Sequence, residues 1–274
     1  MMRDTLCKLP DMVTWPCDEI NYIWRYGNPS FPTDEFSPEM ATRKIKIFIR
    51  KKFHKLSQKL NCKYVVEKTC ANSLRIAYVR EIFPESKFIF LHRDGVDASI
   101  SAMKRWQAKI DIPYILRKAR FVPFSEAHLY ALRFVRNRLH KVLSKENSLA
   151  TWGPRFRGMD RIVEELELIQ ICGIQWSKCV LNAKRELDKI KDNDVLWVSY
   201  EEFVTNPKAC LKEICKFIGI KADSLEIKNS VKKVTNKNIG KGRTVIDQDQ
   251  AELLIPTIFN ALEEFGYIEN ICET

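Results

Sequence analysis

The sequence has 274 residues, of which 45% are hydrophobic and 30% charged, and its formal net charge is +11. This composition supports a sizeable core in one domain and excludes a disordered chain. The excess of Lys and Arg favours polyanionic partners, such as nucleotides, nucleic acids, anionic lipids or acidic glycans, without choosing among them. Because no apolar run reaches membrane-spanning length and no signal peptide pattern opens the chain, we expect a soluble, cytoplasmic protein.

The nine cysteines are scattered without a CxxC pair. Cys172 with Cys179, and Cys210 with Cys215, fall on predicted helices at spacings that match no zinc pattern. We therefore expect reduced thiols rather than disulfides, and no metal site.

The first sixty residues predict two helices around an irregular segment. A short helix over 1–9 ends at Pro10, and residues 15–36 are irregular, aromatic and acidic. Residues 38–60 predict an amphipathic helix, and residues 41–60 alone hold eight Lys or Arg and no acid. This helix is expected to pack through one apolar face (Ile45, Ile49, Phe53, Leu56). Its basic face is either simply solvated or a contact for an acidic acceptor or a membrane surface. The aromatic residues Trp15, Trp24, Tyr22 and Tyr26 either line an acceptor pocket or pack in the core.

The middle of the chain alternates between strand and helix patterns, which predicts an α/β fold with a parallel sheet. The expected elements are a strand over 62–68, a helix over 72–83, a strand over 87–91 and a helix over 94–106. Residues 107–160 are basic and helical with prolines.

The second half of the chain predicts one more strand among helices. The expected elements are a long helix over 160–190, a strand over 194–199, a helix from Asn206 to Gly219, a basic loop over 228–247 and a final helix over 248–264. Asn206 followed by Pro207 is a typical helix start.

Arg93 stands where the strand over 87–91 passes into the helix over 94–106. Ligands of open parallel sheets bind at the carboxyl ends of strands, where helix N-termini attract anions. An arginine there adds a donor suited to phosphate, and Ser99 or Ser101 can face back toward it. The alternative is that Arg93 pairs with Asp94 or Asp97 and that the serines only fill the helix.

Three segments in order resemble the sulfotransferases that use 3′-phosphoadenosine 5′-phosphosulfate (PAPS). They are "EKTCANSLRIAYVREIFPESKFIFLHRDGVDASISAMKRW", "VSYEEFVTNPKACLKEICKFIGI", and "NKNIGKGRTV" followed by a helix and "EEFGY". The resemblance covers most of the chain and is weakest over residues 107–190. It implies a single domain over 1–274 with a P-loop nucleotide-kinase-like three-layer α/β fold, a parallel sheet and a helical cap over about 107–160.

The resemblance also implies which residues bind the nucleotide. Arg93 and Ser101 match the family's pair that binds the 3′-phosphate of PAPS. Lys241, Gly242 and Arg243 match the loop that closes over that phosphate, although the family often has a bulkier residue in the place of Gly242. PAPS is then a co-substrate, and the transfer needs no metal.

Two further residues are implied as catalytic groups. "PDMVTWPCDEINYIW" is similar to a bacterial-type, tyrosylprotein sulfotransferase-like branch, and Glu19 occupies the place of its base. Lys68, at the end of the strand over 62–68, would contact the sulfuryl group or the bridging oxygen. The alternatives are that Glu19 and Asp18 are a loop or helix-cap acid pair, and that Lys68 is a solvated lysine beside Glu67.

The start of the chain departs from the family pattern. The family has a first strand and a loop of the type G-x-x-[RK]-S-G-T that wraps the 5′-phosphosulfate. Here "MMRDTLCKLPD" resembles the helix that follows this loop, so we expect the fold to lack the first strand and the 5′-phosphosulfate loop. Because that strand is central, neighbouring strands would be left unpaired, and we expect the chain as written to be poorly stable or inactive.

The sequence therefore predicts a sulfotransferase that moves a sulfuryl group from PAPS to a hydroxyl or amine of a small molecule, glycan or peptide. No specific nucleic acid partner and no transmembrane segment are expected. A P-loop kinase-like phosphotransferase would need a Walker lysine and a magnesium-binding acid, which are not evident. The other alternative is a non-catalytic remnant that binds polyanions through residues 41–60.

Overall fold

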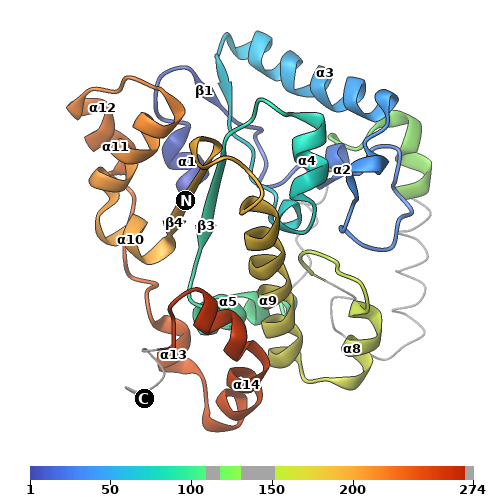
Figure 1. Cartoon of the computed structure of the whole chain (residues 1–274), viewed down its shortest axis with the longest axis vertical. Coiled ribbons are helices and arrows are strands. Elements are labelled where there is room, and N and C mark those ends of the chain that lie inside the picture. The colour runs from blue at the N-terminus through green and yellow to red at the C-terminus, as the bar shows by residue number, and fades with distance from the viewer. Residues whose placement is uncertain (109–117, 131–151, 269–274) are drawn as a thin grey trace.

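The computed structural model describes residues 1–108, 118–130 and 152–268. The helices and strands, in chain order (Figure 1), are α1 (Met2–Leu6), β1 (Met12–Val13), α2 (Asn21–Trp24), α3 (Arg43–Leu60), β2 (Tyr64–Val65), α4 (Ile76–Ile82), β3 (Phe88–His92), α5 (Gly95–Trp106), α8 (Met159–Glu165), α9 (Leu168–Leu187), β4 (Val195–Ser199), α10 (Tyr200–Thr205), α11 (Pro207–Ile218), α12 (Ser224–Val231), α13 (Lys241–Val245) and α14 (Gln248–Glu264). Short 3-10 turns cover Pro38–Met40, Cys70–Leu74, Phe124–Glu126 and Asp192–Asp194.

The strands form two separate parallel pairs. In the first pair, Met12 of β1 stands opposite Tyr64 of β2, and in the second pair Phe88 of β3 stands opposite Val195 of β4. The predicted parallel α/β architecture is therefore confirmed, but in the described part of the chain β2 and β3 do not pair with each other. This separation agrees with the expectation that strands are left without a neighbour.

A cavity of about 1290 Å³ is lined by residues of both β2 and β3. The backbone N–H groups of Tyr64 and Val66 donate to Asp11 and Val13 on the β1 side, at 2.8 and 2.7 Å. Because alternate residues of a strand point their N–H groups to opposite sides, the N–H of Val65 points to the other edge, toward β3. Among the described residues, no strand pairs with this edge of β2 or with the edge of β3 that faces away from β4.

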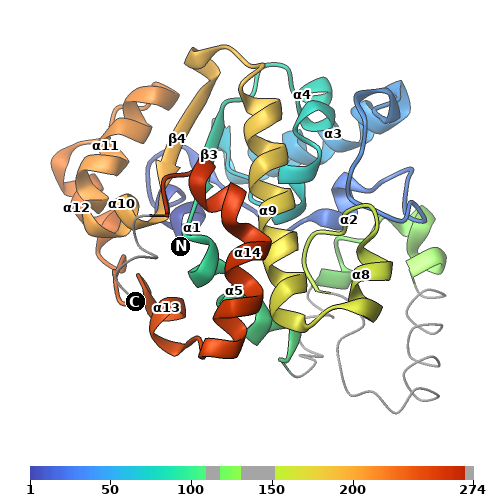
Figure 2. The same ribbon diagram turned by 60° about the horizontal axis from the view of Figure 1, so that its bottom comes forward.

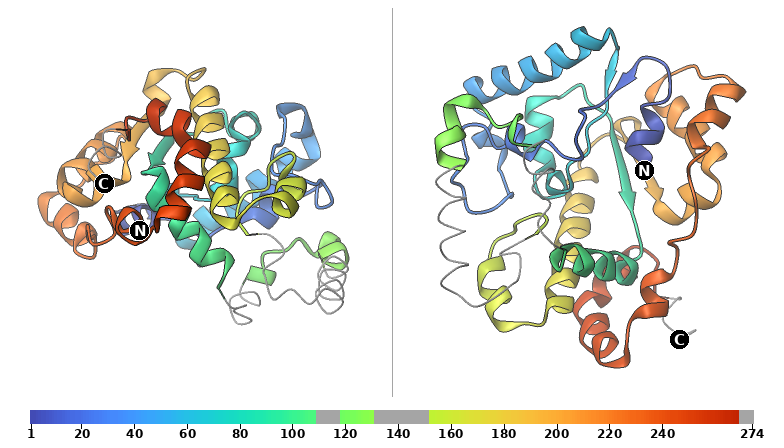
Figure 3. Two further views of the ribbon diagram at one scale, coloured as in Figure 1. Left: turned by 90° about the horizontal axis from the view of Figure 1, so that it is seen from below. Right: turned by 180° about the vertical axis from the view of Figure 1, so that it is seen from behind.

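Helices cover the second pair of strands. On one side α1 packs with α11 and α12. Figure 3 (right) shows the N-terminus between β3 and the orange helices α10–α12. On the other side α9 lies beside α14, as Figure 2 shows, and both contact α5. Gly173 allows this close approach, because a Cβ there would lie 2.6 Å from Leu254 Cδ1.

Helix α3 packs over the first pair of strands with the predicted face. Ile49 is fully buried and Ile45 nearly so. The ring of Phe53 lies edge-on between Trp15 and Trp24, with centroid distances of 4.6 and 5.5 Å. Both tryptophans are buried in the core, as one of the two alternatives expects, and Trp24 also lines the cavity between the two sheets.

A buried ion cluster holds the irregular segment over 15–36. Asp34 accepts hydrogen bonds from Arg25 Nη1 at 2.8 Å, Asn21 Nδ2 at 3.2 Å and the Arg155 N–H at 2.9 Å. Arg75 Nη1 lies 3.5 Å from the same carboxylate. Because burial is costly for an unpaired charge, the four partners make this segment fold around Asp34.

Several predicted boundaries are wrong. The single helix over 160–190 is two helices, since Leu166 is extended and Glu167 opens α9 in a capping box with Gln170. The basic loop over 228–247 contains the end of α12 and the short α13. The strand β1 was not predicted, because two residues carry no periodicity. Much of the predicted cap over 107–160 lies outside the described residues.

Among the residues described, no helix is both long enough and apolar enough to cross a membrane. Eight cysteines are free thiols, and the ninth lies outside the described residues. Burial raises the pKa of several of them, for example Cys172 to about 12. These thiols are therefore protonated at neutral pH, as expected for reduced core residues.

Replacing Asp34 by alanine is expected to lower the free energy of unfolding by about 3–5 kcal/mol, because it leaves two buried guanidinium groups without their carboxylate. The matched control is Asp188→Ala, which removes an exposed pair with Lys184 and should cost less than about 1 kcal/mol. Urea unfolding of both variants measures the difference. Equal losses would contradict the role given to the cluster.

Candidate functional site

A basic residue follows the carboxyl end of each of the strands β2 and β3. Lys68 lies three residues after β2, and Arg93 directly follows β3. Both line the cavity between the two sheets. The two predicted cationic groups thus share one cavity at the edge of the sheets where ligands of parallel α/β folds bind.

Glu19 and Lys68 form the first cluster. Lys68 Nζ donates to Glu19 Oε1 at 3.0 Å, and the Cys70 N–H donates to the same oxygen at 3.2 Å. Glu19 is 27% exposed and Lys68 49%, so both side chains are reachable from solvent. Sequence reasoning proposed both residues separately, and the structure brings them together.

The charges of this pair support each other. Burial alone would raise the pKa of Glu19, but the Lys68 charge and the Cys70 hydrogen bonds lower it below its usual value. Burial alone would lower the pKa of Lys68, whereas Cys70 and Glu19 raise it. At neutral pH the cluster therefore holds a carboxylate that can accept a proton, next to an ammonium group.

Arg3 fixes the loop that carries Glu19. Its Nη1 donates to the carbonyl oxygens of Cys17 and Asp18 at 2.6 and 2.8 Å. Its Nη2 and Nε donate to Asp4. Arg3 thus links α1 to the residues directly before Glu19.

Glu67 does not pair with Lys68, contrary to one of the alternatives. It accepts hydrogen bonds from Thr69 Oγ1 at 2.5 Å and Asn72 Nδ2 at 2.8 Å. Burial raises its pKa to about 7, against the effect of these donors. Sequence reasoning gave Glu67 no role of its own, because only its burial distinguishes it from an ordinary glutamate at a strand end.

Arg93 is held in place from three sides. Its Nη2 donates to Asp97 Oδ2 at 2.8 Å and to the Asn238 carbonyl at 2.5 Å. Its guanidinium carbon lies 4.5 Å from the centre of the Tyr200 ring. The predicted alternative, pairing with Asp97, is therefore realised. The arginine side chain nevertheless remains 23% exposed.

The segment over 240–243 packs against the first turn of α5. The N–H groups of Gly240 and Gly242 donate to Asp97 at 2.9 and 2.5 Å, and Arg243 Nη2 donates to Asp94 at 2.6 Å. Figure 2 shows α13 next to α5. Gly242 and Arg93 thus share the Asp97 carboxylate, and Arg243 pairs with the neighbouring Asp94. Sequence reasoning considered both carboxylates only as partners of Arg93.

Ser101 and Lys241 lie near the same corner. Ser101 is exposed and is four residues beyond Asp97, so it lies on the same face of α5 one turn further along. Ser99 is fully buried, and its Oγ has no partner in the described structure. Of the two serines, only Ser101 can reach a ligand. Lys241 is exposed.

A series of hydrogen bonds connects His92, Tyr267 and Glu201 to the backbone next to Arg93. His92 Nδ1 lies 3.0 Å from the Tyr267 hydroxyl, which donates to Glu201 Oε2 at 2.9 Å. Glu201 Oε1 accepts the N–H of Asp94 at 3.1 Å. Burial lowers the pKa of His92, so its ring is neutral at neutral pH and, as Tyr267 donates to Glu201, His92 carries its proton on Nδ1. These contacts give His92 a structural role behind the corner at Arg93.

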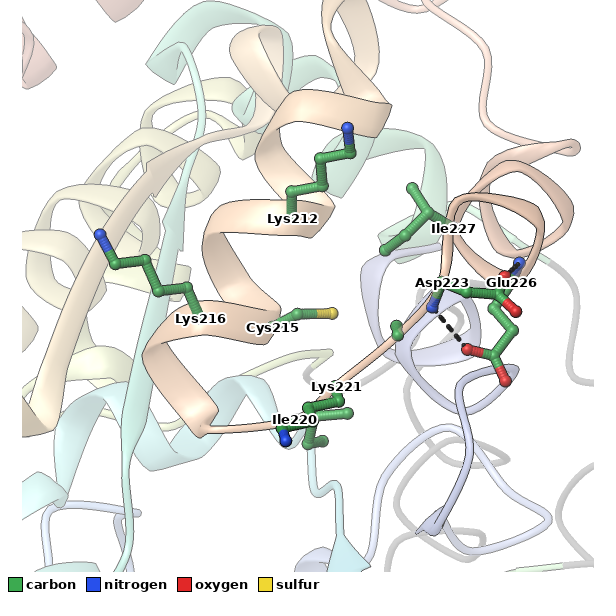
Figure 4. A pocket seen from close by; sticks show the side chains of 9 residues that line it. Lys212, Cys215, Lys216, Ile220, Lys221, Asp223, Glu226 and Ile227 are labelled. Atoms are coloured by element: carbon green, nitrogen blue, oxygen red, sulfur yellow. Dashed lines mark hydrogen bonds between the residues drawn. The ribbon is translucent and has the colours of Figure 1, made fainter.

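The described residues include no group of three or more His, Cys, Asp or Glu side chains placed to hold a metal ion. A second cavity, of about 600 Å³, lies between α11 and α12 and is lined by Lys212, Lys216 and Lys221 (Figure 4). Its acidic residues are engaged in the helix cap, where the Asp223 N–H donates to Glu226 at 2.8 Å. It holds none of the predicted site residues.

Comparisons with known proteins agree with the sequence resemblance. Residues 7–121 match the model of a family described as "Sulfotransferase family". The structure is similar to a solved structure described as "Sulfotransferase Domain from the Curacin Biosynthetic Pathway", with a TM-score of 0.54 and 12% sequence identity over 97% of this chain and 92% of that chain. No curated protein matches the sequence.

The resemblance to sulfotransferases is therefore confirmed by a family model and by a solved structure. The chain has an α/β fold with small parallel sheets, similar to that of a sulfotransferase domain. The family model matches the part of the chain that holds Glu19, Lys68 and Arg93.

Replacing Glu67 by glutamine is expected to stabilise the protein increasingly as the pH rises. Glu67 loses its proton near pH 4.5 in the unfolded chain and near pH 7 in the folded protein. The protonated Glu67 therefore contributes its full stability below about pH 4.5, and the unchanged protein loses this contribution as the pH rises from 4.5 to 7. The glutamine variant has no proton to lose and so does not show this loss. The advantage of the variant in thermal midpoint should grow by on the order of a few degrees between pH 5 and pH 8. The exposed Glu213→Gln serves as control. An advantage that is the same at both pH values would contradict the burial argument.

Proposed function

We propose that the protein is a PAPS-dependent sulfotransferase that acts on a hydroxyl or amine of a small molecule, glycan or peptide. The single observation that carries this proposal is the shared cavity, whose lining includes Lys68 after β2 and Arg93 after β3. Lys68 stands beside a carboxylate, and Arg93 stands beside the segment over 240–243. The proposal includes one domain over 1–274. It also includes a cytoplasmic location, which the free thiols support.

In this proposal the two clusters bind opposite ends of the nucleotide. Arg93, Ser101 and Lys241 bind the 3′-phosphate, because a guanidinium, a hydroxyl and an ammonium are its natural donors. Gly242 and Arg243 contribute by closing the loop against α5. Lys68 faces the other end of the nucleotide, where the sulfuryl group leaves its phosphate.

Glu19 acts as the base of the transfer. It accepts the proton of the acceptor while the acceptor oxygen or nitrogen forms a bond to sulfur. The bond between sulfur and the bridging oxygen breaks, and its electron pair leaves with the 5′-phosphate. Lys68 stabilises the negative charge on that oxygen. The low pKa of Glu19 keeps the carboxylate ionised and ready for the proton.

The open edge between β2 and β3 belongs to the same proposal. The resemblance implies a P-loop nucleotide-kinase-like three-layer fold, in which a central strand and its loop stand between these two sheets. The N–H of Val65, which points away from β1, and the cavity between the sheets support a strand position here.

Arg93→Ala is expected to weaken the binding of 3′-phosphoadenosine 5′-phosphate by about 10- to 100-fold, because it removes a charged hydrogen-bond donor of the phosphate. Titration calorimetry at fixed salt measures this. Arg105→Ala is the matched control, since Arg105 is exposed further along the same helix, and it should leave the affinity within about twofold.

Two results of this titration would contradict the proposal. Equal affinity of both variants and the unchanged protein would remove Arg93 from the phosphate site. Binding that is equally strong for any polyanion, and that falls steeply with salt, would instead favour a polyanion-binding remnant that uses the basic face of α3.

Glu19→Gln is expected to lower kcat by about 10²- to 10⁴-fold while the KM for the nucleotide changes little, because the amide cannot accept the proton. The assay follows sulfuryl transfer from PAPS to the acceptor. Asp18→Asn is the control, since this neighbouring carboxylate is 64% exposed and it is Glu19 that accepts the hydrogen bond of Lys68. If Asp18→Asn lowers kcat more than Glu19→Gln does, Glu19 is not the base.

A further inference from the structure

Asp97 is a buried carboxylate that receives three donors from two distant parts of the chain. Gly240 and Gly242 donate backbone N–H groups, and Arg93 donates through Nη2. The two glycines lie 143 and 145 residues away in the sequence. The side chain of Asp97 is only 1% exposed. We call residues 240–242 the glycine loop.

The helix itself does not need this carboxylate. The N-cap of α5 is Asp94, whose side chain already accepts the N–H of Asp97 at 2.9 Å. Asp97 can therefore direct both oxygens outward, Oδ1 to Gly242 and Oδ2 to Gly240 and Arg93. Because a buried carboxylate is costly unless it is fully bonded, these donors are held strongly in place.

We infer that Asp97 is a positioning residue for the phosphate site: it holds Arg93 and the glycine loop to each other in the arrangement that binds the 3′-phosphate. This inference rests on the proposed function. Asp97 engages one guanidinium nitrogen of Arg93 and so fixes the direction of the others. Lys241 stands between the two anchored glycines, so its position relative to Arg93 is set by the same carboxylate.

Gly242 provides an independent check of this contact. A Cβ at Gly242 would lie 2.6 Å from Asp97 Cα and 2.9 Å from Asp97 N. These are backbone atoms of a helix and cannot move aside, so a side chain would push the glycine loop away from α5. Gly242 is therefore required for contact with Asp97, and its N–H is engaged by Asp97 rather than by a ligand.

The first test uses no nucleotide. Asp97→Asn keeps the size of the side chain but removes its charge and turns one acceptor into a donor. Trypsin can cut the segment at Lys237, Lys241 and Arg243, and we expect about tenfold faster cleavage there in the variant, because the loop loses its anchor. Gly242→Ala should have the same effect. The exposed Asp192→Asn is the control and should cleave like the unchanged protein.

The second test separates positioning from a general loss of structure. Affinities are measured for 3′-phosphoadenosine 5′-phosphate and for adenosine 5′-phosphate, which lacks the 3′-phosphate. Asp97→Asn should lower the preference for the first by about tenfold while the second changes by less than about twofold. A purely structural role would weaken both alike.

Each outcome decides something. Unchanged cleavage and an unchanged preference in a folded Asp97→Asn variant would overturn the inference, and so would an equal loss for both nucleotides. If the unchanged protein shows no preference for the 3′-phosphate, the proposed function fails. In that case the cleavage rates still decide whether Asp97 anchors the glycine loop.

Discussion

The carboxylates of Asp94 and Asp97 join two parts of the chain that are far apart in sequence. Arg243 reaches Asp94 and the glycine loop reaches Asp97, and both carboxylates lie in the first turn of α5. Because both acids are nearly buried, they depend on these donors for their charge to be tolerated. This contact brings the C-terminal segment to the corner at Arg93 and so builds the second cluster of the candidate site.

The second constraint is the separation of the two strand pairs. With β2 and β3 apart, Lys68 and Arg93 stand at the ends of two different small sheets and face one cavity. The loop that carries Glu19 is tied to the segment after β2, because the Ile20 N–H donates to Thr69 Oγ1, and it is tied to α1 through Arg3. Arg93 is tied to the second sheet through Asp97 and Tyr200. The relative position of the two clusters therefore depends on what fills the space between the sheets.

Much of this arrangement could be predicted from the sequence, and the rest could not for physical reasons. The apolar run before Arg93 and the helical spacing after it predicted β3 and α5, because both patterns are local. The choice between a free Arg93 and one paired with Asp97 could not be made, since it depends on a loop about 145 residues away. The raised pKa of Glu67 and the break at Leu166 likewise depend on burial and packing, which periodicity does not report.

The central claim is that the two clusters form one nucleotide site, and hydrogen–deuterium exchange with and without 3′-phosphoadenosine 5′-phosphate tests it most directly. The account predicts slower exchange on binding in three segments together: residues 66–72, 92–101 and 238–245. Protection confined to α3, or to only one of the two clusters, would contradict a single site that spans both sheets.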